Sequence, residues 1–330
     1  MATAVENFKE KIVEGRYAVL VAAIVVLVMR FLLFYFRGVP EPLVIDTGFL
    51  WRFVAPLFSN PSISFGVSTL FVFWIALLIA GVNNRFSLIH TRTSLPFIVP
   101  LFILSLHPVF LMITPDLIST LLVVFALFPL LKAYQQTDTR LFSFRSSILI
   151  GIAGLFQIYA LLLLPLWWRG EMSMRGRQPK SFLAFVFGFF LVYLSVFALY
   201  FLFDNVYGFY APFLFFVHFL PLVIPLLSVV EWIGLALLFI YILLSMKWSG
   251  RAKKLTSSSI NFMVSVVFFS MIFQVVYWHE TKFFIFTGIA LISYLIAYYH
   301  SRSASKIHVV LAFVVVTILA VFYSSNYLLP

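Results

Sequence analysis

Long apolar runs recur along almost the whole chain, and they constrain the fold more than any other feature. Each run approaches the roughly 20 residues that a helix needs to cross a hydrocarbon layer. Hydrophobic residues make up 63% of the 330 residues, and the mean hydropathy of +1.10 is far above that of soluble domains. Because the runs lack the two-residue alternation of a barrel, we predict an all-α, polytopic transmembrane helical bundle.

Hydropathy predicts about 9–11 spans, and no segment between them is long enough for a soluble domain. We therefore expect residues 1–330 to form a single integral membrane domain. Residues 1–17, which carry several Glu and Lys, are expected to form a short interfacial helix on the cytoplasmic side. The predicted spans are 18–36, 62–82, 95–113, 116–134, 146–168, 181–203, 208–229, 231–247, 258–278, 283–299 and 307–325.

The chain carries 22 Lys and Arg against 11 Asp and Glu, which gives a net charge of +11. In a soluble protein this excess would point to nucleic acid. Here most basic residues form short clusters between spans, as the positive-inside rule predicts, so we expect no nucleic-acid partner and a cytoplasmic N-terminus.

One basic cluster conflicts with this orientation. If 146–168 is a single span, then Arg169, Arg175, Arg177 and Lys180 lie on the outer side. The alternative is that 146–168 forms a hairpin that enters and leaves from the cytoplasmic side, and 204–228 then lies along the outer surface or re-enters. The sequence leaves both topologies open.

Several classes of chemistry are excluded by the residues that are missing. The chain has no cysteine, so it has no disulfide and no thiolate site. His107, His218 and His308 have no carboxylate at helical spacing, which disfavours a metal site. We find no phosphate-binding glycine loop and no nucleophilic serine motif, and therefore predict no metal and no cofactor.

Acidic residues in the expected outer loops are the first candidates for a site. Asp46 lies in the mostly apolar segment V-I-D-T-G-F-L-W, where a carboxylate needs a partner or water, and Glu41 precedes it in the same loop. Asp116 follows Pro115 at the start of a span, so its alternative role is a helix cap.

Basic residues provide the second set of candidates. In the stretch H-E-T-K, His279 and Lys282 could hold a phosphate beside Glu280, although a histidine and a lysine at a helix end also form an interfacial anchor. Arg30, inside the first predicted span, either lines a cavity or extends toward the membrane surface.

Three segments resemble the glycosyltransferases of the GT-C fold, which use polyprenyl-phosphate sugars. L-S-L-H-P-V-F-L-M-I-T-P-D-L is similar to the superfamily pattern in which Pro-Asp opens a span after a short outer loop. S-I-L-I-G-I-A-G-L-F-Q-I-Y resembles its glycine-spaced hairpin, with Gln157 where lysine is common. H-E-T-K-F-F resembles a Lys-Glu-x-Arg-Phe element, with His279 and Lys282 at the two basic positions. The whole chain also resembles a family of bacterial multi-spanning inner-membrane proteins.

The resemblance implies sugar transfer from a polyprenyl-phosphate donor at the outer face of the bacterial inner membrane. It assigns the role of catalytic base to Asp46, because an acid in the first outer loop acts on the acceptor in that superfamily. The superfamily usually pairs two acids there, whereas Asp46 has only Glu41 five residues away. Residues expected to contact substrate are Arg30, Glu41, Arg52, Asp116, His279, Glu280 and Lys282.

Two other functions fit the same sequence. The chain could be a non-catalytic membrane subunit or lipid-binding scaffold of a cell-envelope assembly, with membrane lipids and an envelope protein as partners. A small transporter is less well favoured, because charged residues are scarce inside the predicted spans and Arg30 is the clear exception.

Overall fold

The computed structural model describes residues 15, 17–38, 48–91, 93–176, 178–216, 229–250, 252–278, 280–302, 311, 314–321 and 323–324. In these residues the regular structure is helical and contains no strand. Six helices are long and apolar enough to cross a membrane, which confirms the predicted multi-pass helical bundle. They are α2 (Ala18–Arg37), α4 (Pro61–Phe86), α6 (Pro115–Lys132), α9 (Pro179–Leu202), α12 (Lys254–Val276) and α13 (Phe283–Arg302).

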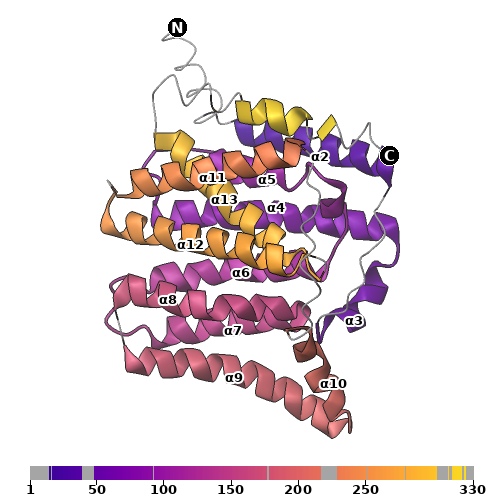
Figure 1. Ribbon diagram of the computed structural model, residues 1–330, viewed down its shortest axis with the longest axis vertical. Coiled ribbons are helices and arrows are strands. Elements are labelled where there is room, and N and C mark those ends of the chain that lie inside the picture. The colour runs from indigo at the N-terminus through magenta and orange to yellow at the C-terminus, as the bar shows by residue number, and fades with distance from the viewer. Residues whose placement is uncertain are drawn as a thin grey trace.

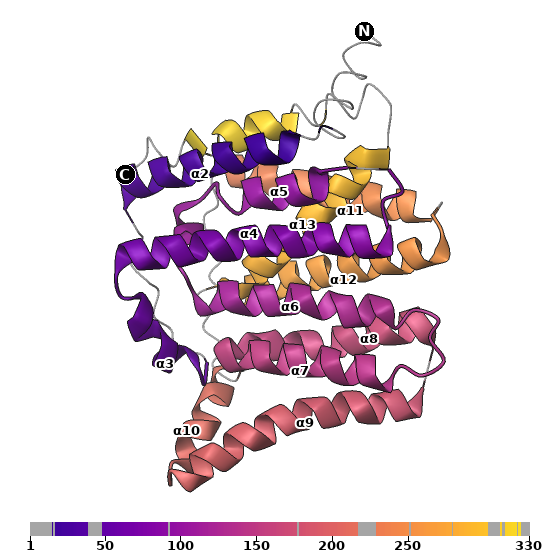
Figure 2. The same cartoon turned by 180° about the vertical axis from the view of Figure 1, so that it is seen from behind.

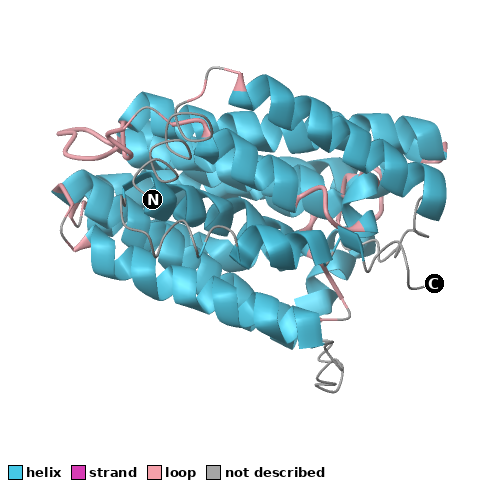
Figure 3. Cartoon of the chain, turned by 90° about the horizontal axis from the view of Figure 1, so that it is seen from above, coloured by secondary structure: helices cyan, strands magenta, loops and turns pink. Residues whose placement is uncertain are grey.

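The remaining elements are shorter or less strongly apolar. They are α3 (Trp51–Val54), η2 (Ala55–Phe58), α5 (Leu95–Ile103), η3 (Pro108–Leu111), α7 (Arg140–Phe156), η4 (Ile158–Leu163), α8 (Leu164–Arg175), α10 (Val206–Tyr210), η5 (Ala211–Phe216) and α11 (Val229–Ser249). The long helices lie side by side with similar axis directions, from α2 at one edge to α9 at the other (Figures 1 and 2). Figure 3 shows the same common direction from above.

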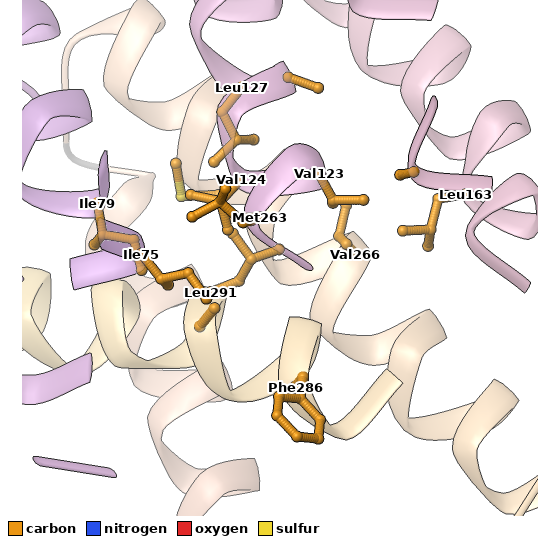
Figure 4. Close-up of a cluster of buried hydrophobic side chains, with 14 of the residues drawn as sticks. Ile75, Ile79, Val123, Val124, Leu127, Leu163, Met263, Val266, Phe286 and Leu291 are labelled. Atoms are coloured by element: carbon orange, nitrogen blue, oxygen red, sulfur yellow. The ribbon is translucent and has the colours of Figure 1, made fainter. Parts of the chain in front are cut away.

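The core lies where α4, α6, α12 and α13 meet. Ile75, Val124, Met263 and Leu291 pack there, each from a different one of these helices (Figure 4). Within the most apolar part of each helix, 83% of the residues are buried in α13 and 67% in α6, but only 22% in α2 and in α9. Because lipid tails are as apolar as leucine side chains, the exposed faces of α2 and α9 suit contact with membrane lipid.

Residues 140–175 form a hairpin, so the prediction of a single span over 146–168 is wrong. The Ser143 hydroxyl in α7 donates a 2.8 Å hydrogen bond to Oε2 of Glu171 in α8, which places the first turns of α7 beside the last turns of α8. The two arms, 140–156 and 158–175, are longer than predicted. This end of the bundle, where α6 ends at Lys132 and α7 begins, is called the basic end, and it also receives Arg169 and Lys180.

The other end of the bundle, where α6 and α13 begin, is called the opposite end. There α10 follows the end of α9 and runs at a steep angle to it (Figures 1 and 2), so the predicted span 208–229 does not start as one straight helix. The chain turns because Asp204 has a φ of 56°, and the Asn205 side chain accepts a hydrogen bond from the Gly208 N–H. Residues 217–228 lie outside the described residues.

Three further predictions need correction or stay open. The predicted span 95–113 is broken, because α5 ends at Ile103 and the chain turns through η3 before α6. The expected interfacial helix over 1–17 falls almost entirely outside the described residues, as does much of the predicted span 307–325, although 314–321 is helical.

Candidate functional site

Three segments that are distant in sequence meet at the opposite end of the bundle. Oδ1 of Asp116 accepts hydrogen bonds from Nε2 of Gln157 at 2.6 Å and from the Thr281 hydroxyl at 2.9 Å. The backbone N–H of Lys282 also donates to the Asp116 carboxylate. The partners stand 41 and 165 residues from Asp116. This set of contacts is called the Asp116 network.

The N-terminus of α6 is capped by Thr114, two residues before Asp116. The Thr114 hydroxyl accepts a hydrogen bond from the Leu117 N–H at 3.3 Å, and Pro115 occupies the first turn. Thr114 is therefore the N-cap, and the alternative role of Asp116 as the cap is wrong. Because the cap is satisfied by Thr114, the Asp116 carboxylate is available to residues from other elements.

Gln157 enters the network because α7 ends there. Its backbone is extended, with φ −141° and ψ 107°, and its side chain is buried. Nε2 of Gln157 also donates to the Thr281 hydroxyl oxygen at 3.0 Å. A primary amide has two N–H donors, so one nitrogen can hold Asp116 and Thr281 together.

Thr281 and Gln274 hold the α12–α13 connection, and sequence analysis assigned neither a role. The Thr281 hydroxyl oxygen accepts from the Phe283 N–H at 3.0 Å, at the start of α13. Gln274 donates through Nε2 to the Thr281 carbonyl at 2.9 Å and accepts from the Ile285 N–H at 3.2 Å. The available signal was a glutamine within an apolar span, since a polar side chain there needs a partner.

Lys282 lies beside the network, and its cation contacts an aromatic ring. Nζ is 4.4 Å from the ring centroid of Trp278 and donates to the Trp278 carbonyl at 3.2 Å. Burial lowers the pKa of Lys282, and the negative charge of Asp116 opposes this shift. Among the described residues, the ion pair joins Asp138 to Arg140 at the basic end and does not involve Lys282. The Lys282 ammonium is held instead by its cation–π and carbonyl contacts with Trp278.

Arg52 belongs to a neighbouring part of the same end. It is exposed on α3, donates a hydrogen bond to the Tyr200 hydroxyl and lines a cavity. Just before α3, the Leu50 N–H donates to the Leu155 carbonyl at 2.9 Å. This bond fixes the end of the first loop on the last turn of α7, two residues before Gln157.

Arg30 is buried inside the bundle and does not extend toward the membrane surface. Its side chain is fully buried, and it donates to the side-chain oxygens of Ser68 and Thr69 at 2.9 and 3.0 Å. It also donates to the carbonyls of Leu104 and Phe110 at 3.2 and 2.8 Å. These carbonyls belong to the connection between α5 and α6, so Arg30 holds the segment that leads into Asp116.

Of the remaining predicted site residues, Glu280 is described by the structure and lies half-buried in the turn before α13. Asp46, Glu41 and His279 lie outside the described residues, so their roles stay predictions. In the part of the chain that the structure describes, no group of three or more His, Cys, Asp or Glu side chains could hold a metal ion.

Comparison with known proteins finds no relative of the chain. No protein-family model matches the chain, and no curated protein or solved structure is significantly similar to it.

Proposed function

We propose that the chain is a membrane glycosyltransferase-like enzyme that transfers a sugar from a polyprenyl-phosphate donor to an acceptor. One observation carries the proposal. Asp116, Gln157 and the pair Thr281 and Lys282, which come from the three segments that resemble GT-C glycosyltransferases, meet at one end of the bundle. Segments so distant in sequence have no local reason to lie together.

In the proposed reaction an acceptor hydroxyl oxygen attacks the anomeric carbon of the donor sugar. The carboxylate of Asp46 takes the hydroxyl proton, the bond between the anomeric carbon and the phosphate oxygen breaks, and the lipid phosphate leaves with the bonding electrons. Lys282, together with His279 and Arg52, supplies positive charge for this phosphate. The Asp116 network positions the turn that carries Lys282.

The proposal includes an orientation in a bacterial inner membrane. The basic end, with Lys132, Arg140, Arg169 and Lys180, faces the cytoplasm, and the Asp116 network faces outward. The hairpin over 140–175 favours this orientation, because it brings the previously conflicting basic cluster to the same end as the others.

A second function is favoured by the way the network is satisfied. Asp116 receives hydrogen bonds from Gln157, Thr281 and the backbone of Lys282, and the Lys282 cation contacts Trp278. Such a network can simply fix three loops. The chain would then be a non-catalytic membrane subunit or a lipid-binding scaffold.

Transfer of a radiolabelled sugar distinguishes the two functions. The purified chain is reconstituted in liposomes with labelled polyprenyl-phosphate sugars and a membrane extract as acceptor source. Because a general base contributes typically about 10²–10⁴ in rate, Asp46→Asn should reduce transfer at least about 100-fold. Asp138→Asn, at the basic end, is the control. Transfer that is equal in Asp46→Asn and the wild type would reject the proposed catalytic role.

A further inference from the structure

The cavity beside Arg52 has the dimensions of a small ligand site. Its volume is about 370 Å³, which is within the roughly 300–1,000 Å³ typical of ligand pockets. Arg52 comes from α3 and Tyr200 from the last turn of α9, and the rest of the wall comes from Gly48, α10 and η5. Gly48 and the elements α3, α9, α10 and η5 therefore line one open cavity at the opposite end.

Two glycines of the cavity wall lie close against neighbouring elements. A Cβ atom on Gly48 would lie 2.1 Å from the Phe156 carbonyl oxygen. A Cβ atom on Gly208 would lie 2.8 Å from a ring carbon of Tyr200. Larger residues at either position would push the first loop or α10 away, so the cavity depends on both glycines.

The Arg52 guanidinium is oriented but retains hydrogen-bond donors. It donates to the Tyr200 hydroxyl, and its central carbon lies 5.0 Å from the Phe53 ring centroid and 5.4 Å from that of Tyr200. A guanidinium has five N–H donors in a planar fork that matches the oxygens of a phosphate. No carboxylate of a described residue lies within ion-pair distance of Arg52, since the described ion pair joins Asp138 and Arg140.

The cavity lies at the end of a helix that is long and apolar enough to cross a membrane. The candidate span Pro179–Leu202 ends two residues after Tyr200. Beyond it Phe203 and Tyr207 have 79% and 74% of their surface exposed, and exposed aromatic residues at a span end are typical of the headgroup region. The adjacent face of α9 is exposed and apolar, so it can contact acyl chains.

We propose that this cavity binds the headgroup of an anionic phospholipid, with the phosphate on the Arg52 guanidinium and the acyl chains along α9. Inorganic phosphate shares the recognised group and is the other source of such a ligand. The inference goes beyond the proposed function, because a bilayer phospholipid is neither the sugar donor nor the acceptor, although the donor phosphate of the proposed reaction would compete with it for Arg52. It therefore does not require any transfer activity.

Native mass spectrometry of the full chain in a neutral detergent tests the site. Phosphatidylglycerol, phosphatidylcholine and inorganic phosphate are titrated separately. We expect the wild type to prefer phosphatidylglycerol, and Arg52→Gln to weaken its binding by about tenfold, the effect of losing charge-assisted hydrogen bonds. The control Arg140→Gln removes an exposed arginine at the basic end and should bind as the wild type does.

The outcomes separate the ligand sources. Binding of phosphatidylglycerol but not of inorganic phosphate identifies the lipid headgroup, and Arg52-dependent binding of both identifies phosphate itself. Unchanged phosphatidylglycerol binding in Arg52→Gln, or an equal loss in Arg140→Gln, overturns the proposal. If Arg52→Gln does not fold, Arg52→Lys decides, because it keeps the charge but loses the planar fork. An affinity equal to that of the wild type would also overturn the site.

Discussion

Nε2 of Gln157 lies 2.6 Å from Oδ1 of Asp116, and this contact joins the turn of the 140–175 hairpin to the first turn of α6. The same nitrogen reaches the Thr281 hydroxyl oxygen, so one amide connects three loops. A buried amide and a carboxylate that satisfy each other make each turn depend on the other for its position. The network should therefore contribute to stability whatever reaction it serves.

We expect Gln157→Ala to destabilise the protein. The substitution removes two donated hydrogen bonds and leaves Asp116 with fewer donors, which costs about 1–3 kcal/mol. Thermal unfolding of the purified protein in detergent should show a lower midpoint. Gln136→Ala, in the exposed turn between α6 and α7, is the matched control and should leave the midpoint unchanged. Equal midpoints for both variants would show that the network contributes no net stability.

Arg30→Ala should be more damaging than Gln157→Ala. It removes a buried cation that donates four hydrogen bonds, and leaves two carbonyls of the α5–α6 connection without this donor. Each buried acceptor that loses its donor costs about 1–3 kcal/mol, and Arg30→Ala leaves more than one such acceptor. Arg30→Lys should lie between, because lysine keeps the charge but has fewer donors. Arg145→Ala, on the exposed face of α7, is the comparison for the same loss of charge. A similar midpoint for Arg30→Ala and Arg145→Ala contradicts the structural role.

Stability should rise with pH in a window set by Lys282. Burial lowers the pKa of Lys282 in the folded protein below its ordinary value of 10.5. Between the lowered pKa and 10.5, the unfolded chain binds more protons at this residue than the folded chain does. Raising the pH through this window therefore relieves the cost of burying the charged lysine.

The difference between the wild type and Lys282→Gln isolates this contribution. Unfolding midpoints are measured across the window for both, with Lys180→Gln as the exposed-lysine control. We expect the pH-dependent rise to be smaller in Lys282→Gln and unchanged in Lys180→Gln. A rise of the same size in all three proteins would assign it to other groups.

Labelling of single introduced cysteines should report the hairpin. The chain has no cysteine of its own, so each introduced thiol is the only target. A membrane-impermeant maleimide should label Gln136→Cys and Lys180→Cys from the same side of the membrane, and Ser59→Cys from the other. A single span over 146–168 requires Gln136→Cys and Lys180→Cys to react from opposite sides. Reaction from the cytoplasmic side in the first two would also establish the proposed orientation.

Hydropathy predicts the six long helices well because lipid thickness sets their length, but it does not predict where the chain turns within 95–113, 146–168 and 208–229. The first span, predicted over 18–36, is α2 (Ala18–Arg37), and the predicted span 283–299 lies within α13 (Phe283–Arg302). The sequence does not distinguish the hairpin from a single span, because apolar residues continue on both sides of Gln157. Only the distant hydrogen-bond partners of Gln157 show that the helix ends there.

The site was harder to predict than the helices. Asp116 and Lys282 are visible as rare charges, but the hydrogen bonds that Thr281 and Gln274 make depend on how α12 and α13 are joined. The N-cap could have been predicted correctly, since Thr-Pro-Asp has the residue order of a cap followed by proline at the first helical position. No comparable pattern reveals that Arg30 binds the carbonyls of the α5–α6 connection.

The contacts of Arg30 impose an order on how the protein is assembled during synthesis. A charged residue in the middle of a lone helix costs about 2.5–3.5 kcal/mol on insertion scales. The oxygens that satisfy Arg30 come from residues made later, and Phe110 follows it by 80 positions. Until α4 and the α5–α6 connection emerge and pack, α2 carries an unsatisfied cation. α2 can reach its final free energy only after α4, α5 and the segment through Phe110 have left the ribosome.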